Sequence, residues 1–506
     1  MKLLIKSKFF STCLGVLAVF LGIGFILPIS SFSVYITSNI YSKHDYVTMH
    51  YGFFISLIFT FANTISVTLG GYLENLIGFY KTTTVGFIIA FIANTCFIFQ
   101  QDIWFCYCLT LIVGTGAGVA TSLLGKNVTL YLPDKKGIVS GIFGIGIMII
   151  SAIYALSGEK LINFEGYTLE EDESFYPKRI AKNTYKYFLI GEFLIPIGLI
   201  FALLLLYEYK PEEISDQKLE GEKQISQEEK ENVTKEEAKE EIKEEAKEEK
   251  KEEIKEETKE ETEEERQLKM KIIKQKLKRV LKTFRFWKIS LISFFINISI
   301  SFMVTTGRTF GALIGINGTA LQFAGMAQVL ATLIIGPILG ILVDKKGGLI
   351  ILRITAIISI LPPIFLAFFM QNTAIFIICF VFDVLVLVGV MVCFGPFIMD
   401  IYGIQESVLF GGFINGFSKI GDVITTFGAF GFSLVCDEDK DCLKSRYQIM
   451  YFISALCCGI SCFLLFLERG DKYEYDITSD EENVLIDENK KNEKLVINPN
   501  EGQVEE

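Results

Sequence analysis

The chain has 506 residues, of which 51% are hydrophobic, and its mean hydropathy is +0.43. A water-soluble protein of this length has no interior large enough for so much apolar sequence, so we expect an integral membrane protein. The net charge of −11 indicates nothing about a ligand, because most acidic residues lie in one central segment, one loop and the C-terminal tail.

Catalytic and nucleic-acid-binding functions find no support in the sequence. It contains no nucleophile–base pattern, Walker loop or dinucleotide fingerprint, and its basic stretch adjoins an apolar run, which does not favour nucleic-acid binding. Only two histidines occur, His44 and His50, and no Cys-x-x-Cys pair has metal spacing. We therefore expect no enzyme activity, no metal and no cofactor.

Twelve apolar runs are long enough to cross a bilayer as helices, which needs about 20 residues. Lys2, Lys6 and Lys8 precede the first run and favour a cytoplasmic N-terminus, and an even number of spans then places the C-terminus on the same side. In chain order the expected spans are about 9–32, 50–73, 82–100, 103–131, 138–157, 185–207, 286–314, 320–343, 349–370, 374–400, 407–434 and 446–467.

The composition changes abruptly after the sixth span. From Lys210 to Arg266 the chain is mostly Glu and Lys, which predicts a solvated helix or a disordered segment. Residues 268–282 combine helical apolar spacing with positive charge only, which favours an amphipathic helix on the inner leaflet, although an ordinary surface helix has the same pattern. We expect a linker over 208–284 and an acidic cytoplasmic tail over 470–506.

Two related loops occur in the chain, one after the second span of each half. The second copy runs from Gly340 to Gly348, and the first, over residues 71–78, has Asn75 where the second has an aspartate. Small residues allow helices to approach closely, and the later glycines permit a tight turn. The candidate residues for a conformational loop are Gly71, Asn75, Gly78, Gly340, Asp344, Lys345 and Gly347.

The second copy resembles the G-x-L-x-D-R-x-G-R loop of the major facilitator superfamily, with lysine in place of the first arginine. The resemblance implies an all-α membrane fold of twelve helices in two pseudo-symmetric six-helix bundles, here over 1–207 and 285–469. It also implies that spans one, four, seven and ten line a central cavity, which directs attention to Lys126, Arg308 and Asp383.

A narrower resemblance covers short stretches of both halves. Residues 114–146, with Pro133 and Lys136, and residues 395–421 are similar to the oxalate–formate antiporter and monocarboxylate porter families. Lys419 is similar in placement to a carboxylate-binding lysine of the former family. The aspartate–arginine pair that animal monocarboxylate porters carry in span eight is absent. The charged insert and tail resemble parasite-type relatives, which include apicomplexan pantothenate transporters.

Charges inside apolar spans cost at least a few kcal/mol and therefore indicate function. Three cations are candidate contacts for a substrate carboxylate: Lys419, Arg308 and Lys126. For Lys419 the alternative is an intrahelical pair with Asp422, three residues on. For Arg308 and Lys126 the alternative is a side chain that extends to the nearest membrane interface.

Three acids are candidate proton carriers: Asp383, Asp422 and Glu192. Asp383 lies near the middle of span ten, where a helix–helix hydrogen bond is the alternative, and Glu192 could equally serve packing or gating. Cys436 and Cys442 flank an acidic external loop and could form a disulfide, because that side of a membrane is oxidising.

The leading hypothesis is a monomeric secondary transporter in the plasma membrane. It would carry a small organic anion of the monocarboxylate class, such as pantothenate or a lactate-like acid, with protons or a counter-anion, by alternating access. The alternative is a non-transporting sensor or scaffold that acts through its charged linker, which the eroded first loop at Asn75 supports.

Removal of residues 215–260 distinguishes the two hypotheses. A transporter keeps its uptake activity, because the deleted residues are mostly Glu and Lys and have too few apolar side chains to form part of a bundle. Uptake of labelled solute into vesicles measures this, and a scaffold instead loses capture of its partner while its membrane insertion is unchanged.

Overall fold

The structure is a computed structural model. It describes residues 2–44, 46–47, 51–167, 175–209, 271, 274–313, 318–369, 372–404, 406–436 and 440–471. The chain divides into two compact units, of which the larger comprises Ser7–Tyr209 and Thr283–Lys472. Most of the expected linker and tail, and the acidic patch of the loop after span five, lie outside the described residues; in the other unit, residues 274–281 are helical.

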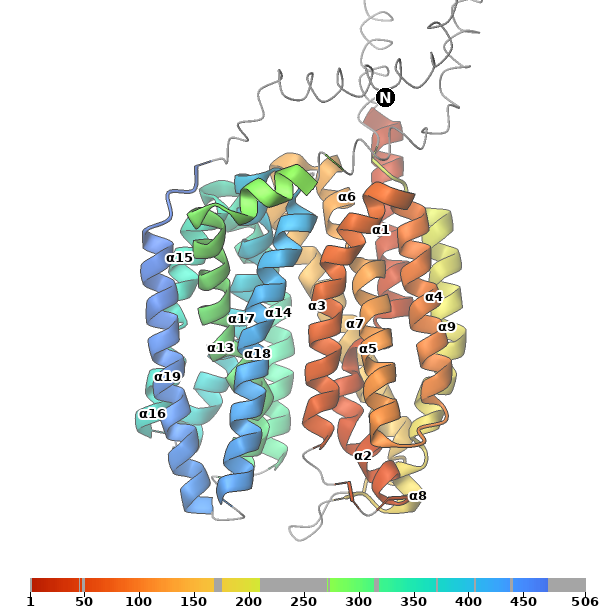
Figure 1. The fold of residues 1–506 in the computed structure, drawn as a ribbon, viewed down its shortest axis with the longest axis vertical. Coiled ribbons are helices and arrows are strands. Elements are labelled where there is room, and N and C mark those ends of the chain that lie inside the picture. The colour runs from red at the N-terminus through yellow and green to blue at the C-terminus, as the bar shows by residue number, and fades with distance from the viewer. Residues whose placement is uncertain are drawn as a thin grey trace, which may run out of the picture. The chain divides into compact units, whose positions relative to one another are not determined.

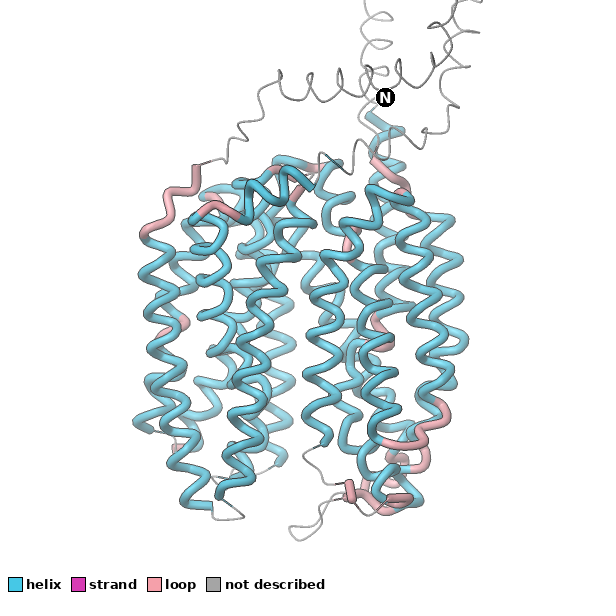
Figure 2. The backbone as a smooth tube through the Cα atoms, viewed as in Figure 1, coloured by secondary structure: helices cyan, strands magenta, loops and turns pink. Residues whose placement is uncertain are grey.

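Within the larger unit the helices gather in two bundles, and no strand occurs in the described ranges (Figures 1 and 2). The first bundle runs from red to yellow in Figure 1. Its elements are α1 (Lys2–Ile23), η1 (Leu27–Phe32), α2 (Ser33–Tyr41), α3 (Tyr51–Ile77), α4 (Phe79–Phe97), α5 (Ile103–Thr121), α6 (Leu124–Tyr131), η2 (Pro133–Lys135), α7 (Lys136–Ile162), α8 (Lys178–Ala181) and α9 (Thr184–Leu205).

The second bundle runs from green to blue and repeats the pattern. Its elements are α13 (Phe284–Leu313), α14 (Gly318–Lys346), α15 (Gly348–Ile358), α16 (Leu361–Phe369), α17 (Thr373–Tyr402), α18 (Ser407–Cys436) and α19 (Lys440–Phe466). Spans one, four and nine are each built from successive shorter helices rather than one continuous helix. Pro28 breaks the first of these, because a proline cannot donate a backbone hydrogen bond.

The helix lengths agree with the twelve spans expected. Among the described residues, nine stretches are long and apolar enough to cross a membrane: Lys8–Ile29, Phe54–Ile77, Ile103–Tyr131, Pro133–Ile162, Lys178–Leu205, Phe284–Met303, Gly348–Phe369, Thr373–Tyr402 and Asp441–Phe466. The helices α4, α14 and α18 pack among them and complete the set of twelve. The predicted all-α membrane fold of two six-helix bundles is confirmed.

Two equivalent turns mark one end of the bundles. Gly78 and Gly347 have φ of 82° and 89° and lie between α3 and α4 and between α14 and α15. Each glycine N–H donates to the carbonyl four residues earlier, at 2.9 Å for Glu74 and 2.8 Å for Val343. We call this the motif end, and the opposite end, which holds Cys436, the disulfide end.

The two bundles contact each other along three helix pairs, α3 with α18, α7 with α14 and α7 with α17. Near the motif end α7 and α14 approach so closely that side chains are excluded. A Cβ atom added to Gly340 would lie 2.6 Å from the Gly137 carbonyl oxygen, and one added to Gly141 would lie 2.8 Å from that of Gly336. Such backbone proximity needs glycine on both helices.

A buried carboxylate ties three helices of the second bundle together at the motif end. Glu468, only 2% exposed, follows α19 and pairs with Arg285 at 2.7 Å and Lys288 at 2.6 Å, both on α13. Arg353 of α15 donates to the carbonyls of Leu465 and Glu468. Burial alone would raise the pKa of Glu468, but the Lys288 hydrogen bond and the two positive charges hold that pKa below its usual range.

This lowered pKa predicts a pH-dependent effect of Glu468→Gln. Because the folded pKa lies below the unfolded value near 4.5, the carboxylate stabilises the fold above that pH, and the contribution disappears as pH falls through the folded pKa. The variant should therefore melt at a lower temperature than the parent at pH 7, with a gap that narrows below about pH 4.5. A gap independent of pH would contradict the ion-pair account.

Candidate functional site

Lys419 lies on α18 within a polar cluster shared with α13. Its Nζ is 2.8 Å from the Asp422 carboxylate, and the two side chains are 21% and 12% exposed. Asn297 of α13 donates from Nδ2 to the other Asp422 oxygen at 2.5 Å. A hydrogen bond of 3.1 Å between Ser301 and Thr425 extends the cluster along the same two helices.

This cluster neutralises its charges internally. The lysine and the carboxylate form the i, i+3 pair that the sequence offered as the alternative, and the amide fixes the carboxylate from the neighbouring helix. The lysine remains partly exposed, so its remaining N–H groups have room for a further acceptor. A second carboxylate at this point would meet a positive charge that is already oriented.

Asp383 lies on α17 and is 3% exposed, so the structure buries it more deeply than the other predicted acids. Its Oδ2 atom is buried with no hydrogen-bond partner. Cys379, one turn earlier on the same helix, is part of the buried core of the second bundle. The residue therefore belongs to the interior of the second bundle.

Lys126 lies on α6 and pairs with Glu74 near the end of α3, with Nζ 2.8 and 3.0 Å from the two carboxylate oxygens. The side chains are 10% and 16% exposed, so each charge has its counter-charge within the first bundle. Arg308 falls on α13, but its side chain lies outside the described residues.

Glu192 of α9 is bound by two side chains of α4. Asn94 donates to one carboxylate oxygen at 2.6 Å and Thr95 to the other at 2.9 Å. Asn94 also donates to the Phe188 carbonyl at 2.9 Å. The structure thus places Glu192 between α4 and α9 on the side of the first bundle away from α13–α19 (Figure 1), not beside Lys419.

The carboxylate of Asp344 bridges the two bundles at the motif end. Its oxygens accept from the backbone N–H groups of Gly137 and Ile138, at 2.6 and 3.0 Å, at the start of α7. An anion at this position satisfies two donors that a helix start leaves without partners and complements the helix dipole. A Cβ on Gly137 would lie 2.8 Å from this carboxylate, so only glycine leaves room for it.

The first copy of the loop does not repeat this contact. Asn75 donates to the carbonyl of Gly71 in its own helix, at 2.8 Å. Gly71 faces Val408 at the start of α18, where an added Cβ would lie 2.9 Å from a Val408 methyl group. The α3–α18 contact at this end therefore rests on close packing, whereas the α7–α14 contact carries a charge.

A second ion pair reinforces the bridge. Lys136, the first residue of α7, bonds to Asp400 near the end of α17, and the side chains are 25% and 35% exposed. Asp400, Glu74 and Asn297 were not among the predicted site residues. Sequence signals for them existed, because Asp400 ends an apolar span and Glu74 lies inside the first loop motif, but only the fold reveals their partners.

Close contact between the bundles leaves little space between α7, α14 and α17. A hollow of about 10 Å³ lies between α7, α14 and α17, lined by Gly141, Gly144, Ile145, Thr332, Val388, Met391 and Val392. That volume is at most enough for one water molecule. In the described ranges no group of three His, Cys, Asp or Glu side chains is arranged for a metal ion.

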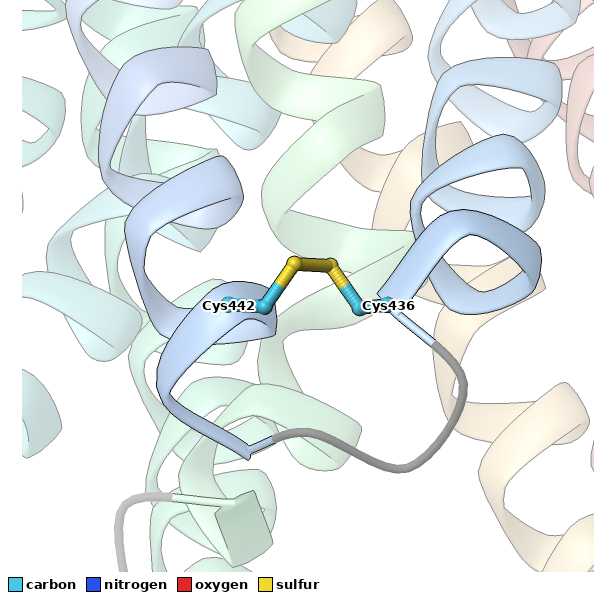
Figure 3. Close-up of a disulfide and its surroundings, with 2 residues drawn as sticks. All are labelled: Cys436 and Cys442. Atoms are coloured by element: carbon cyan, nitrogen blue, oxygen red, sulfur yellow. A yellow bond between two sulfur atoms is a disulfide. The ribbon is translucent and has the colours of Figure 1, made fainter.

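At the disulfide end Cys436 and Cys442 are bonded across the turn between α18 and α19, with Cα atoms 5.6 Å apart (Figure 3). This connection ties together the ends of two helices that both pack on α13. Phe54 of α3 contacts the rings of Phe427 and Phe430 of α18, at 5.3 and 5.2 Å, so aromatic packing continues the α3–α18 contact toward this end.

A family model described as the Major Facilitator Superfamily matches residues 12–426. No curated protein sequence matches the chain. The match therefore defines the family without indicating a substrate.

Solved structures resemble the fold at low sequence identity. A proton:xylose symporter bound to 6-bromo-6-deoxy-D-glucose is 14% identical, with a TM-score of 0.60 over 92% of this chain and 97% of that one. The human organic anion transporter TETRAN is 10% identical, with a TM-score of 0.56 over 91% and 99%. The fucose:proton symporter of E. coli is 13% identical, with a TM-score of 0.53 over 90% and 98%.

The Asp344 bridge predicts how readily the motif end opens. Asp344→Ala removes both hydrogen bonds to α7, and hydrogen bonds to charged groups each contribute about 1.5–3 kcal/mol, so the open population should rise about tenfold or more. Ser140→Cys reports this, because Ser140 lies against Gly395 of α17. Its alkylation rate, followed by peptide mass spectrometry, should rise by the same factor.

The matched control is Asp134→Ala, which removes an exposed carboxylate two residues before Lys136. It should leave the alkylation rate at position 140 unchanged. Equal rates in the Asp344→Ala variant and its parent would show that the bridge does not hold the motif end closed.

Proposed function

We propose that this chain, which belongs to the Major Facilitator Superfamily and is a secondary active transporter, carries a small organic anion of the monocarboxylate class. The observation that carries the proposal is the partly exposed lysine of the Lys419–Asp422–Asn297 cluster. A positive charge inside a membrane bundle is costly and is retained where it binds an anion or forms part of an ion path.

The cluster supplies a simple exchange of partners. In the empty transporter Asp422 neutralises Lys419 at 2.8 Å. An entering carboxylate takes up a remaining N–H of the lysine while Asn297 keeps Asp422 in place. Lys419 therefore always has an anionic partner, either Asp422 or the substrate. A lysine without one in a low-dielectric interior would cost several kcal/mol. Pantothenate and lactate-like acids each have the single carboxylate that this arrangement needs.

Alternating access follows from the contacts between bundles. The motif end is closed here by the Asp344 bridge, by Lys136–Asp400 and by the Gly137–Gly340 approach. These contacts are short and confined to one end, so they can break together when the bundles rock about the site. We place the motif end in the cytoplasm and the disulfide in the oxidising exterior of the plasma membrane, with both termini cytoplasmic.

Coupling to protons or to a counter-anion drives net transport. Asp422 is the acid best positioned for protons, because its charge state controls whether Lys419 is free for the substrate. The solved structures that resemble this fold include two proton symporters and an organic anion transporter, and this likeness supports both parts of the proposal. Lys126 and Glu192, each bound within the first bundle, serve packing and gating in this scheme.

The proposal predicts a specific loss in Lys419→Ala. Removal of a charged hydrogen-bond donor should raise the KM for the transported monocarboxylate by about tenfold to a hundredfold. Uptake of labelled pantothenate and lactate into vesicles, with and without a pH gradient, measures it. Lys419→Arg, which keeps the charge, should recover part of the affinity.

Lys444→Ala is the matched control, because Lys444 forms an i, i−3 pair with Asp441 on α19 and lies at the disulfide end. Its KM should equal that of the parent. An unchanged KM in Lys419→Ala would remove this residue from the binding site. A parent protein that transports no monocarboxylate under any gradient would refute the substrate class.

A further inference from the structure

Two contacts define the register between α3 of the first bundle and α18 of the second. An added Cβ on Gly412 would lie 2.3 Å from the Thr68 hydroxyl oxygen. The ring centroids of Phe54 and Phe427 lie 5.3 Å apart. Between these contacts the two helices run in opposite directions over nearly the same number of residues, so the midpoints of the two stretches lie at one level. Lys419 occupies the midpoint of the α18 stretch and is therefore level with the middle of the α3 stretch.

The middle of the α3 stretch carries two polar side chains, Thr60 and Asn63. On the same helix Ile65 and Leu69 are 44% and 42% exposed and mark the side that faces lipid. Successive residues of an α-helix turn by about 100°, so the two polar side chains point about 120–180° away from these apolar ones. Both polar side chains therefore lie on the side of α3 that is turned to the interior of the transporter.

The polar cluster of α18 lies on the corresponding side of its own helix. Ile420 and Ile424 are 41% and 49% exposed and mark the lipid side of α18. Asp422 points about 160° away from each of them, and Lys419 points about 100–140° away. The lysine and the two polar side chains of α3 therefore approach the interior from opposite bundles at the same level.

The α3 side of this arrangement offers hydrogen-bond acceptors. The Oδ1 atom of Asn63 is buried and has no hydrogen-bond partner among the described residues. The Thr60 hydroxyl donates to the Ser56 carbonyl at 2.9 Å, so its oxygen can still accept. A buried acceptor without a donor costs about 1–3 kcal/mol. A solute that brings an O–H or N–H group to this level would remove that cost.

We propose that Asn63 and Thr60 bind a hydrogen-bond donor of the transported anion, so that the preferred substrate is a monocarboxylate that also carries a hydroxyl or an amide N–H group. Lys419 holds the carboxylate from the second bundle, and Asn63 accepts from the donor group on the first. This inference rests on the proposed function and narrows it. Pantothenate and lactate meet the requirement, whereas propionate and butyrate do not.

Binding of two matched pairs of acids to the purified full-length protein tests the inference. Lactate differs from propionate, and 4-hydroxybutyrate from butyrate, by one hydroxyl group at two different distances from the carboxylate. A site built to bind a hydroxyl disfavours the analogue without it, because the acceptor is then left unpaired. In at least one pair the hydroxylated acid should bind about tenfold more tightly, as measured by the concentration that half-saturates the rise in melting temperature.

Variants assign this preference to α3. Asn63→Leu, which keeps a similar volume, should abolish the preference and leave the affinity for the unhydroxylated acid unchanged. Thr60→Val should reduce the preference by a smaller factor, and it tests the site if the Asn63 variant does not fold. Lys419→Ala should weaken both acids of a pair by the same factor and so keep the preference, because the two groups contact different parts of the solute.

Thr115→Val is the matched control, since Thr115 is an exposed residue of α5 whose hydroxyl donates to the Leu111 carbonyl of its own helix at 2.8 Å. It should retain the full preference. A parent that binds both acids of each pair equally would overturn the inference and leave the proposed function intact, and so would a preference that persists in both α3 variants. A parent that binds none of the four acids would refute the monocarboxylate class itself, and this inference with it.

Discussion

The contact that organises the molecule is the Asp344 carboxylate at the start of α7. Helices in lipid gain nothing from excluding water, so bundles associate through close packing and polar contacts. Here the glycines Gly137 and Gly340 allow two backbones to touch, and the space they leave admits one carboxylate to two backbone N–H groups. This contact is charged and confined to the motif end. The two bundles can therefore be held firmly there and still separate when that one contact breaks.

The other charged side chains in the membrane spans are also held by polar partners. Lys126 is paired with Glu74 and Lys419 with Asp422, so neither cation is left alone in a low-dielectric surrounding. The two pairs differ in where they lie and in whether a solute can bind the lysine. The first joins α6 to α3 close to the motif end, whereas the second is held by an amide from α13 and keeps a partly exposed lysine. Asp383 departs from the pattern, because its buried Oδ2 atom has no hydrogen-bond partner among the described residues.

Much of the fold could be predicted because hydropathy and local chemistry determine it. The apolar runs predicted the twelve spans, and the equal separations of Gly78 from Gly71 and of Gly347 from Gly340 predicted the repeated turn. Partner choice could not be predicted in the same way. Asp400 and Asn297 bind residues that are far away in the chain, and a single sequence does not show which distant segments are in contact. The first span illustrates a third case, because Pro28 interrupts a run that hydropathy alone presents as continuous.

The first loop motif shows how one substitution changes a repeated element. With Asn75 turned back to its own helix, the contact of α3 with α18 lacks the charged bridge that α14 makes with α7. The two halves therefore have the same arrangement of helices, but the α3–α18 and α7–α14 contacts between them differ in chemistry. The charged contact between the bundles is therefore confined to the α7 side of the motif end, and the α3–α18 contact depends on packing.

Rocking of the two bundles is measured most directly as a distance across the motif end. Spin labels at Asp134 of the first bundle and Lys346 of the second, both exposed, report that distance by pulsed electron resonance. The account predicts a short distance for the closed state described here and a second, longer population whose share changes with substrate and ion. A single distance that stays the same under every gradient, ligand and ion would contradict it.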